Sequence, residues 1–126
     1  MKTTETIKTQ LTAEQSQHLI DLGVPREKAS KNGSYYSYKN HTIELYTVFK
    51  LEDFLNGGIL PNKITYNHDD CFLMIIRDVY GNYRVGYAFK TFEGCDFCYN
   101  CEFWGELIDA LYQLACWYYS EFLKNE

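Results

Sequence analysis

The centre of the chain, residues 71–89, reads CFLMIIRDVYGNYRVGYAF. Its first six residues are apolar on both faces of an extended chain, which is typical of a central strand. From Tyr83 onward, large apolar residues alternate with polar or small ones, and this period of two predicts a second strand. Gly81 and Asn82 between the two runs accept the positive φ angles of a tight turn. We therefore expect an antiparallel hairpin in a sheet centred on residues 71–90.

Upstream of this hairpin, the sequence predicts two short helical elements. Thr12 and Gln15 form a capping-box pattern, which predicts a helix over 13–22 that ends at the following glycine. A proline then begins a second helical turn over 25–30. We expect the two elements to form an N-terminal helical hairpin, preceded by a flexible polar N-terminus over residues 1–10.

Tyrosines and β-branched residues fill the segment 35–49, which predicts one strand with one face more buried than the other. Residues 51–55 predict a short helical turn. The sequence Asn56-Gly57-Gly58 ends this turn, and Pro61 then changes the direction of the chain.

The C-terminal segment 102–124 is predicted to be one long helix. Plotted at about 100° per residue, its apolar residues form one wide stripe: Trp104, Leu107, Ile108, Leu111, Leu114, Ala115, Tyr118 and Phe122. Trp117 falls on the polar stripe instead. The expected fold class is α+β, with residues 11–126 forming a single small domain. An antiparallel β-sheet of about 3–4 strands would carry the N-terminal helical hairpin and the long C-terminal helix packed on it.

Composition narrows the class of protein. The 126 residues are 46% hydrophobic and 17% aromatic, which is enough to build one core and excludes a disordered chain. The longest apolar runs are far shorter than the roughly 18 residues that cross a bilayer, so no membrane association is expected. The net charge is −5, and residues 91–126 hold seven acidic side chains against one basic. Because duplex binding relies on Lys and Arg, duplex nucleic acid is not an expected partner.

Five cysteines and no signal peptide predict a cytoplasmic protein with reduced thiols. Cys95, Cys98 and Cys101 follow a Cys-x2-Cys-x2-Cys pattern, whose thiolates can converge on one zinc ion or on an iron–sulfur cluster. A fourth ligand would come from one of the remaining candidates, which are His68, Cys71 and Cys116. The alternative is that these cysteines are free thiols in a loop rich in Tyr and Phe.

The misplaced Trp117 suggests a docking surface. A tryptophan among acidic and polar side chains resembles the centre of a protein interface, where an aromatic anchor lies inside a polar rim. The surface would comprise Glu106, Asp109, Tyr112, Gln113 and Trp117, and its partner would be another protein or a second copy in a homodimer. The alternative is a helix buried on two sides, with Trp117 packed under a loop.

Tyr35, Tyr36, Tyr38, Lys39 and Tyr46 form a basic and aromatic neighbourhood. Rings for stacking and a cation for phosphate are the residue types that bind a nucleotide or another small ligand. The alternative is that these tyrosines are ordinary half-buried sheet surface. No nucleophile elbow, phosphate-binding glycine loop or HExxH motif is present in the sequence, so it favours a non-enzymatic role.

Four phrases carry a resemblance that spans most of the chain: LTAEQSQHLIDLGVP over residues 11–25 with Lys28-Ala29-Ser30, FKLEDFL over 49–55, LPNKI over 60–64 and ELIDALY over 106–112. They resemble a family of uncharacterised small proteins of Bacteroidales and their phages and mobile elements. That family has no assigned activity, so the resemblance implies no catalytic residues. It implies a bacterial or phage cytoplasmic setting, in which a small acidic domain binds and modulates a host protein.

The expected function is therefore a non-enzymatic protein-binding or self-associating module. The alternative is a small domain that is stabilised by zinc or that binds a nucleotide or another small ligand.

Overall fold

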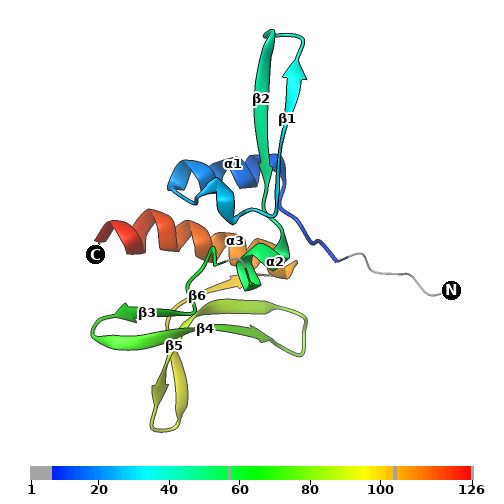
Figure 1. Cartoon of the computed structure of the whole chain (residues 1–126). Coiled ribbons are helices and arrows are strands. Elements are labelled where there is room, and N and C mark those ends of the chain that lie inside the picture. The colour runs from blue at the N-terminus through cyan, green and yellow to red at the C-terminus, as the bar shows by residue number, and fades with distance from the viewer. Residues whose placement is uncertain (1–6, 57, 104, 126) are drawn as a thin grey trace, which may run out of the picture.

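The strands lie in two separate antiparallel sheets, and each strand pairs with a neighbour in the sequence (Figure 1). This architecture comes from a computed structural model, which describes residues 7–56, 58–103 and 105–125. A two-stranded sheet contains β1 (Lys31–Ser37) and β2 (Thr42–Val48). A four-stranded sheet contains, in spatial order, β3 (Lys63–Tyr66), β4 (Asp69–Arg77), β5 (Tyr83–Thr91) and β6 (Gly94–Phe103). The main helices are α1 (Ala13–Leu22), α2 (Leu51–Leu55) and α3 (Leu107–Trp117).

The predicted central hairpin is confirmed as β4 and β5, and the α+β class is confirmed with it. The turn between the two strands is closed by the Asp78 N–H, which donates to the Asn82 carbonyl at 3.0 Å. Gly81 has a φ of 83°, in the left-handed region that favours glycine. The tight-turn chemistry of this segment therefore sets the register of the two inner strands.

The first helix begins and ends where the sequence predicts, but the helical hairpin is not formed. The Thr12 hydroxyl accepts a hydrogen bond from the Gln15 N–H, and Gln15 Oε1 accepts one from the Thr12 N–H. Gly23 ends α1 with a φ of 116°. The second element is only a single 3₁₀ turn, Arg26–Lys28, because the chain becomes extended at Ala29 and enters β1.

The single strand predicted over 35–49 is wrong. This region contains the end of β1, a turn over residues 38–41 and the whole of β2, and the two strands pair as a hairpin. His41 adopts a φ of 55°, so the chain reverses without a glycine at this turn. The tyrosines that looked like one continuous strand are thus divided between two strands and the turn that joins them.

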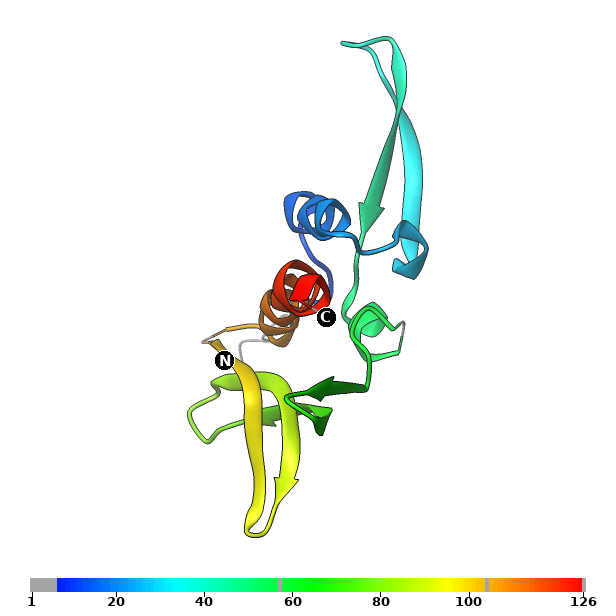
Figure 2. The same cartoon turned by 90° about the vertical axis from the view of Figure 1, so that its left-hand side faces the viewer.

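Helix α3 lies between α1 and the four-stranded sheet, which gives the body of the molecule three layers (Figures 1 and 2). It packs against β5 and β6 on one side and against α1 on the other. The core is formed by fully or almost fully buried side chains from all three layers, among them Leu19, Phe49, Phe54, Ile64, Val85, Tyr87, Ile108, Leu111 and Leu114. The four-stranded sheet turns its other face away from these helices.

The first residue predicted for the long helix over 102–124 lies too early in the chain. The backbone of Phe103 still pairs with Tyr83 as the end of β6, so α3 begins at Leu107. After Trp117 the helix widens into a π turn, Tyr118–Phe122, in which the Leu123 N–H bonds to the Tyr118 carbonyl. A 3₁₀ turn, Leu123–Asn125, follows. Trp104, which was assigned to the apolar stripe, lies outside the described residues.

Part of the segment expected to be a flexible N-terminus contacts the domain. Residues 1–6 lie outside the described residues. Further along, the Leu51 N–H bonds to the Thr9 carbonyl at 2.8 Å, and the Leu11 N–H bonds to the Phe49 carbonyl at 2.9 Å. This short extended segment therefore pairs antiparallel with the chain between β2 and α2, through a bridge between Gln10 and Lys50.

In the described ranges of the chain, no helix has both the length and the apolar character that a membrane span requires.

Candidate functional site

Two regions stand out as candidate binding sites, and the first is the hairpin of β1 and β2. We call residues 31–48 the arm, because this ribbon projects well beyond the helices (Figures 1 and 2). The pairing register assigns each side chain to one of its two faces, since residues opposite one another share a face. One face carries Asn32 opposite Thr47, Ser34 opposite Leu45, and Tyr36 opposite Ile43. We call this set the uncharged face, because the ionisable side chains Lys31 and Glu44 lie on the other.

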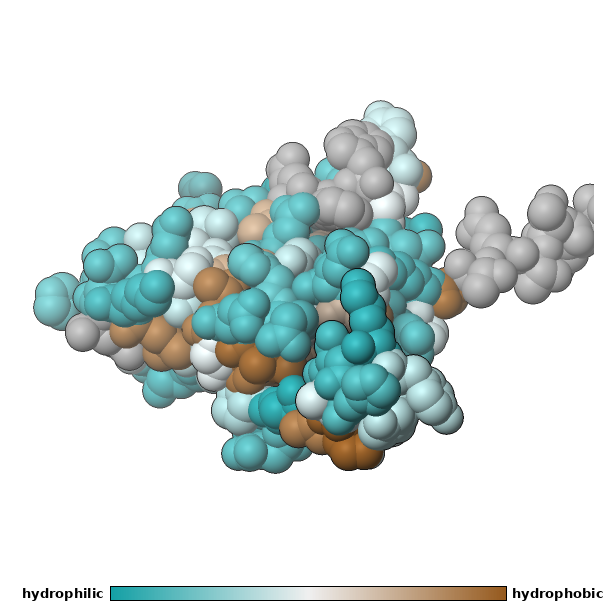
Figure 3. Space-filling view, turned by 90° about the horizontal axis from the view of Figure 1, so that it is seen from above, coloured by the Kyte–Doolittle hydropathy of each residue, from teal (hydrophilic) through white to brown (hydrophobic). Residues whose placement is uncertain are grey.

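Large apolar side chains on the arm are open to solvent. The exposed fractions are 44% for Tyr36, 65% for Ile43 and 66% for Leu45 on the uncharged face, and 83% for Tyr38 in the adjoining turn. The Tyr36 and Tyr38 rings meet edge to face with their centroids 4.9 Å apart. Seen from above, the arm points toward the viewer and shows apolar surface along one side (Figure 3).

The structure does not bring the predicted nucleotide-binding residues to one place. Tyr35 and Tyr46 lie on the charged face of the arm, with their ring centroids 6.4 Å apart. Tyr36 lies on the opposite face, and Tyr38 and Lys39 lie in the turn. A single base therefore has no pair of parallel rings here between which to stack.

The base of the arm is held by one carboxylate, that of the buried Asp53 in α2. Its Oδ2 atom accepts hydrogen bonds from the Ser30 N–H at 3.0 Å, just before β1, and from the Lys50 N–H at 2.8 Å, just after β2. The Ser30 hydroxyl donates to the same oxygen. Both ends of the arm are thus fixed to α2 at a single point.

The second candidate site surrounds Trp117, at the opposite end of α3 from the arm base. Trp117 was expected on an exposed polar stripe, but the structure shows it half-buried. The reason is that α3 is buried on two sides, so that Ala110 and Leu114, which precede Trp117 along one side, are both fully covered. The indole stacks on the ring of Tyr99 from β6, with a centroid distance of 4.0 Å and an angle of 7° between the rings.

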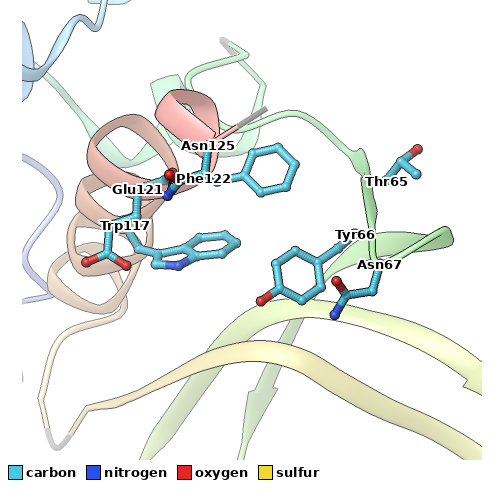
Figure 4. A pocket seen from close by; sticks show the side chains of 7 residues that line it. All are labelled: Thr65, Tyr66, Asn67, Trp117, Glu121, Phe122 and Asn125. Carbon is cyan, nitrogen blue, oxygen red and sulfur yellow. Dashed lines mark hydrogen bonds between the residues drawn. The ribbon is translucent and has the colours of Figure 1, made fainter.

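A cavity of about 350 Å³ opens beside the Trp117 indole. Figure 4 shows the rings of Trp117 and Phe122 facing Tyr66, which reaches across from the end of β3. We call this cavity the aromatic pocket. Its lining residues are Thr65, Tyr66, Asn67, Trp117, Glu121, Phe122 and Asn125. It lies in the volume range of small-ligand sites.

The acidic residues predicted to surround Trp117 are engaged elsewhere. Lys8 Nζ lies 2.7 Å from Asp109 Oδ1, and the Lys8 N–H donates to Glu106 Oε2 at 3.2 Å. The N-terminal segment therefore covers the beginning of this side of α3. Gln113 remains exposed, and Tyr112 is half-buried. The predicted interface residues thus form no continuous open surface around the indole, and their role in binding a partner stays a prediction.

The predicted loop over residues 95–101 is the strand β6, which places its cysteines apart. Cys95 pairs with Lys90 and Cys101 pairs with the buried Val85, so these two thiols lie on opposite faces of the sheet. Cys98 is the extra residue in a bulge opposite Tyr87 and Ala88. In the part of the chain that the structure describes, no cluster of three or more potential metal ligands is found. The other candidate ligands, His68, Cys71 and Cys116, lie in the β3–β4 turn, β4 and α3.

Burial keeps several thiols in their protonated form. It raises the pKa of Cys71 to about 12, and a hydrogen bond with Cys98 adds to the effect. Burial also raises the pKa of Cys101, partly offset by a hydrogen bond with Tyr99. The same cause raises the pKa of Cys116. Because zinc binds the thiolate, these shifts work against metal binding at neutral pH.

Comparison with family models, with curated proteins and with solved structures finds no significant match to this chain.

Proposed function

We propose that the protein is a non-enzymatic binding module that self-associates through the uncharged face of the arm. The observation that supports this proposal is the exposure of Tyr36, Ile43 and Leu45 on one face of a projecting ribbon. A two-stranded hairpin by itself is marginally stable in water, and an antiparallel sheet usually packs one face against other apolar groups. A partner that covers this face supplies the missing layer.

A second copy of the chain suits this face as the partner. Two copies of one patch pack around a twofold axis, in which each residue meets its counterpart or a neighbour. The uncharged face brings no like charges together in such a pair, because its six residues are polar-neutral, aromatic or aliphatic. Two ribbons stacked face to face would form a small two-layer β-sandwich, with a spacing of about 10 Å between the sheets.

The size of the face sets the expected strength of association. If a fully covered tyrosine ring removes roughly 200 Å² from water, the exposed parts of Tyr36 and Tyr38 offer on the order of 250 Å² per chain. Ile43 and Leu45 add to this area, and the total stays at the low end of specific interfaces, near or below about 1,200 Å². We therefore expect a weak, reversible homodimer.

The test is sedimentation velocity over a wide range of protein concentration. Unmodified protein should shift from monomer to dimer as concentration rises. Ile43→Lys should abolish the shift by placing a charge on the uncharged face. The matched control is Thr42→Lys, which adds the same charge to the neighbouring residue on the opposite face and should leave the dimer intact. A monomer at every concentration, or equal loss in both variants, would contradict the proposal.

A further inference from the structure

We infer that the aromatic pocket binds a small organic cation of the alkylammonium type, seated against the rings of Tyr66 and Trp117. This inference goes beyond the proposed function, because none of the lining residues of the pocket belongs to the arm. It rests on the arrangement of the rings, the absence of basic side chains in the lining and the polar groups that the pocket leaves without partners.

The walls of the pocket are aromatic and come from two elements far apart in the sequence. The centroids of Tyr66 and Trp117 are 6.3 Å apart with an angle of 56° between the rings, which is a tilted aromatic pair. Phe122 closes the inner end, 5.6 Å from Trp117 and 6.2 Å from Tyr66. Aromatic faces attract cations through the ring quadrupole, and tryptophan does so most strongly. Several such faces around one space are the usual means of binding a quaternary ammonium group.

The rings are held in place from behind. Tyr99 stacks on Trp117, and Tyr118 stacks on Phe122 at 5.4 Å. The π turn contributes as well, because residues five apart in a regular α-helix point about 140° away from each other. In the wider turn, Trp117 and Phe122 line the same pocket. Single π turns within helices are frequent at functional sites, and here the turn builds one wall from two rings.

The charges around the pocket favour a cation over an anion. Its lining includes the carboxylate of Glu121 and no Lys, Arg or His. Glu121 is exposed at the rim beside the indole (Figure 4), and within the described ranges it forms no ion pair.

Two hydrogen-bond donors at the pocket lack protein partners among the described residues: the indole N–H of Trp117 and the side-chain amide of Asn67. Asn67 has a φ of 50° in the tight β3–β4 turn, and its side chain lies at the mouth of the pocket (Figure 4). These donors suit an oxygen acceptor a few bonds from the cationic centre. Choline combines a quaternary ammonium group with such an oxygen, whereas in trimethyl-lysine the amide oxygens lie at the far end of the four-carbon side chain.

The experiment compares choline with 3,3-dimethylbutan-1-ol, which has the same shape and hydroxyl group but no charge. Binding is followed by NMR through the indole N–H signal of Trp117, assigned with the variant Trp117→Phe. We expect saturable shifts with choline and about tenfold weaker binding of the neutral analogue, within the range of measured cation–π energies. Equal binding of the two compounds, or no binding of either, would overturn the inference.

Charge-removing variants separate the pocket from general electrostatic attraction. Glu121→Gln should weaken choline binding by about threefold, as expected for an exposed carboxylate near the ligand. Glu93→Gln removes the same charge at the exposed β5–β6 turn and should leave the affinity unchanged. An equal loss in both variants would show that no specific site exists. Thermal unfolding of each variant confirms that the fold is retained.

The same titration identifies the source of the cation. The probes are choline and an N-acetylated trimethyl-lysine amide, added separately. Tighter binding of the lysine derivative would assign the cation to a side chain of a protein partner, and tighter binding of choline would assign it to a free small molecule. Failure of this pocket leaves the arm proposal untouched, because dimerisation and choline binding are measured independently.

Discussion

Tyrosine has opposite roles in the arm and in the body of the molecule. Tyr87 in the four-stranded sheet is fully buried, and its hydroxyl donates to the Pro61 carbonyl at 2.7 Å. Tyr119 likewise reaches the Ile59 carbonyl at 2.7 Å. In the arm, Tyr38 is 83% exposed, and its ring meets that of Tyr36 edge to face. The comparison shows that the residue type does not decide burial. A tyrosine is buried where another part of the molecule packs over it, and it stays exposed where it lies on the projecting arm.

The largest effect that distinguishes the two regions should come from removing one tyrosine ring. Tyr87→Ala empties a fully buried site and leaves the Pro61 carbonyl without its donor, so it should lower the free energy of unfolding by about 3–5 kcal/mol. Tyr38→Ala should change it by less than about 0.5 kcal/mol, because the ring is exposed. Urea denaturation of both variants measures the difference. Similar losses in the two variants would show that the arm is packed as tightly as the body.

Alkaline pH should destabilise the body in a predictable direction. The pKa of Cys71 rises from its ordinary value of 9.0 to about 12 in the folded protein, chiefly through burial. Below pH 9 both states keep the proton. Between pH 9 and pH 12 the unfolded chain releases it while the folded chain does not, so stability falls as the pH rises. The loss is on the order of 1 kcal/mol per pH unit for each such group.

The variant Cys71→Ala provides the control for the alkaline transition. Thermal unfolding measured at intervals from pH 7 to pH 11 should show a shallower decline for this variant than for the unmodified protein. Its stability at neutral pH serves as the reference, since the substitution also removes buried volume. Parallel declines in the two proteins would contradict the assigned role of Cys71.

The smallest effect is expected when each of two glycines in extended backbone is replaced by alanine. At Gly86 in β5, an added Cβ meets the Tyr99 carbonyl and lies 2.7 Å from Asn100 Cα, so the backbone of β6 has to move. Gly86→Ala should therefore destabilise by about 1–3 kcal/mol. At Gly33 in the arm, the added Cβ meets only the end of the Tyr46 ring, which can swing into solvent. Gly33→Ala should lower the stability much less. Equal melting temperatures for the two variants would contradict the expectation that the four-stranded sheet is rigid and the arm is adaptable.

Local signals in the sequence predicted those elements whose ends depend on a few neighbouring residues. The capping box at Thr12 and the glycine at position 23 fix both ends of α1. The turn between β4 and β5 likewise fixes the central hairpin. In each case the signal and the hydrogen bonds it predicts lie within a few residues of each other, which is why the sequence suffices.

Elements defined by distant partners were missed or placed wrongly. The strand β6 carries no clear alternation because the bulge at Cys98 shifts its inward-facing residues by one position. The π turn after Trp117 has no sequence signal that separates it from an ordinary helix, so the pairing of Trp117 with Phe122 was not expected. Tyr66 and Asn67 join the pocket only through the β3–β4 turn. Of the residues that line the aromatic pocket, sequence reasoning singled out Trp117 alone as a site residue, and it did so as the centre of a protein interface rather than as the wall of a pocket.

The pairing of every described strand with its sequence neighbour has a consequence for how the molecule folds. Strands β3 to β6 can zip together in the order in which a ribosome releases them, with only short loops to close. Their inner face, with Val85 and Tyr87, stays uncovered until α3 follows and docks. During that interval the nascent sheet presents apolar surface to the cell, and this interval is where aggregation or chaperone binding would compete with folding.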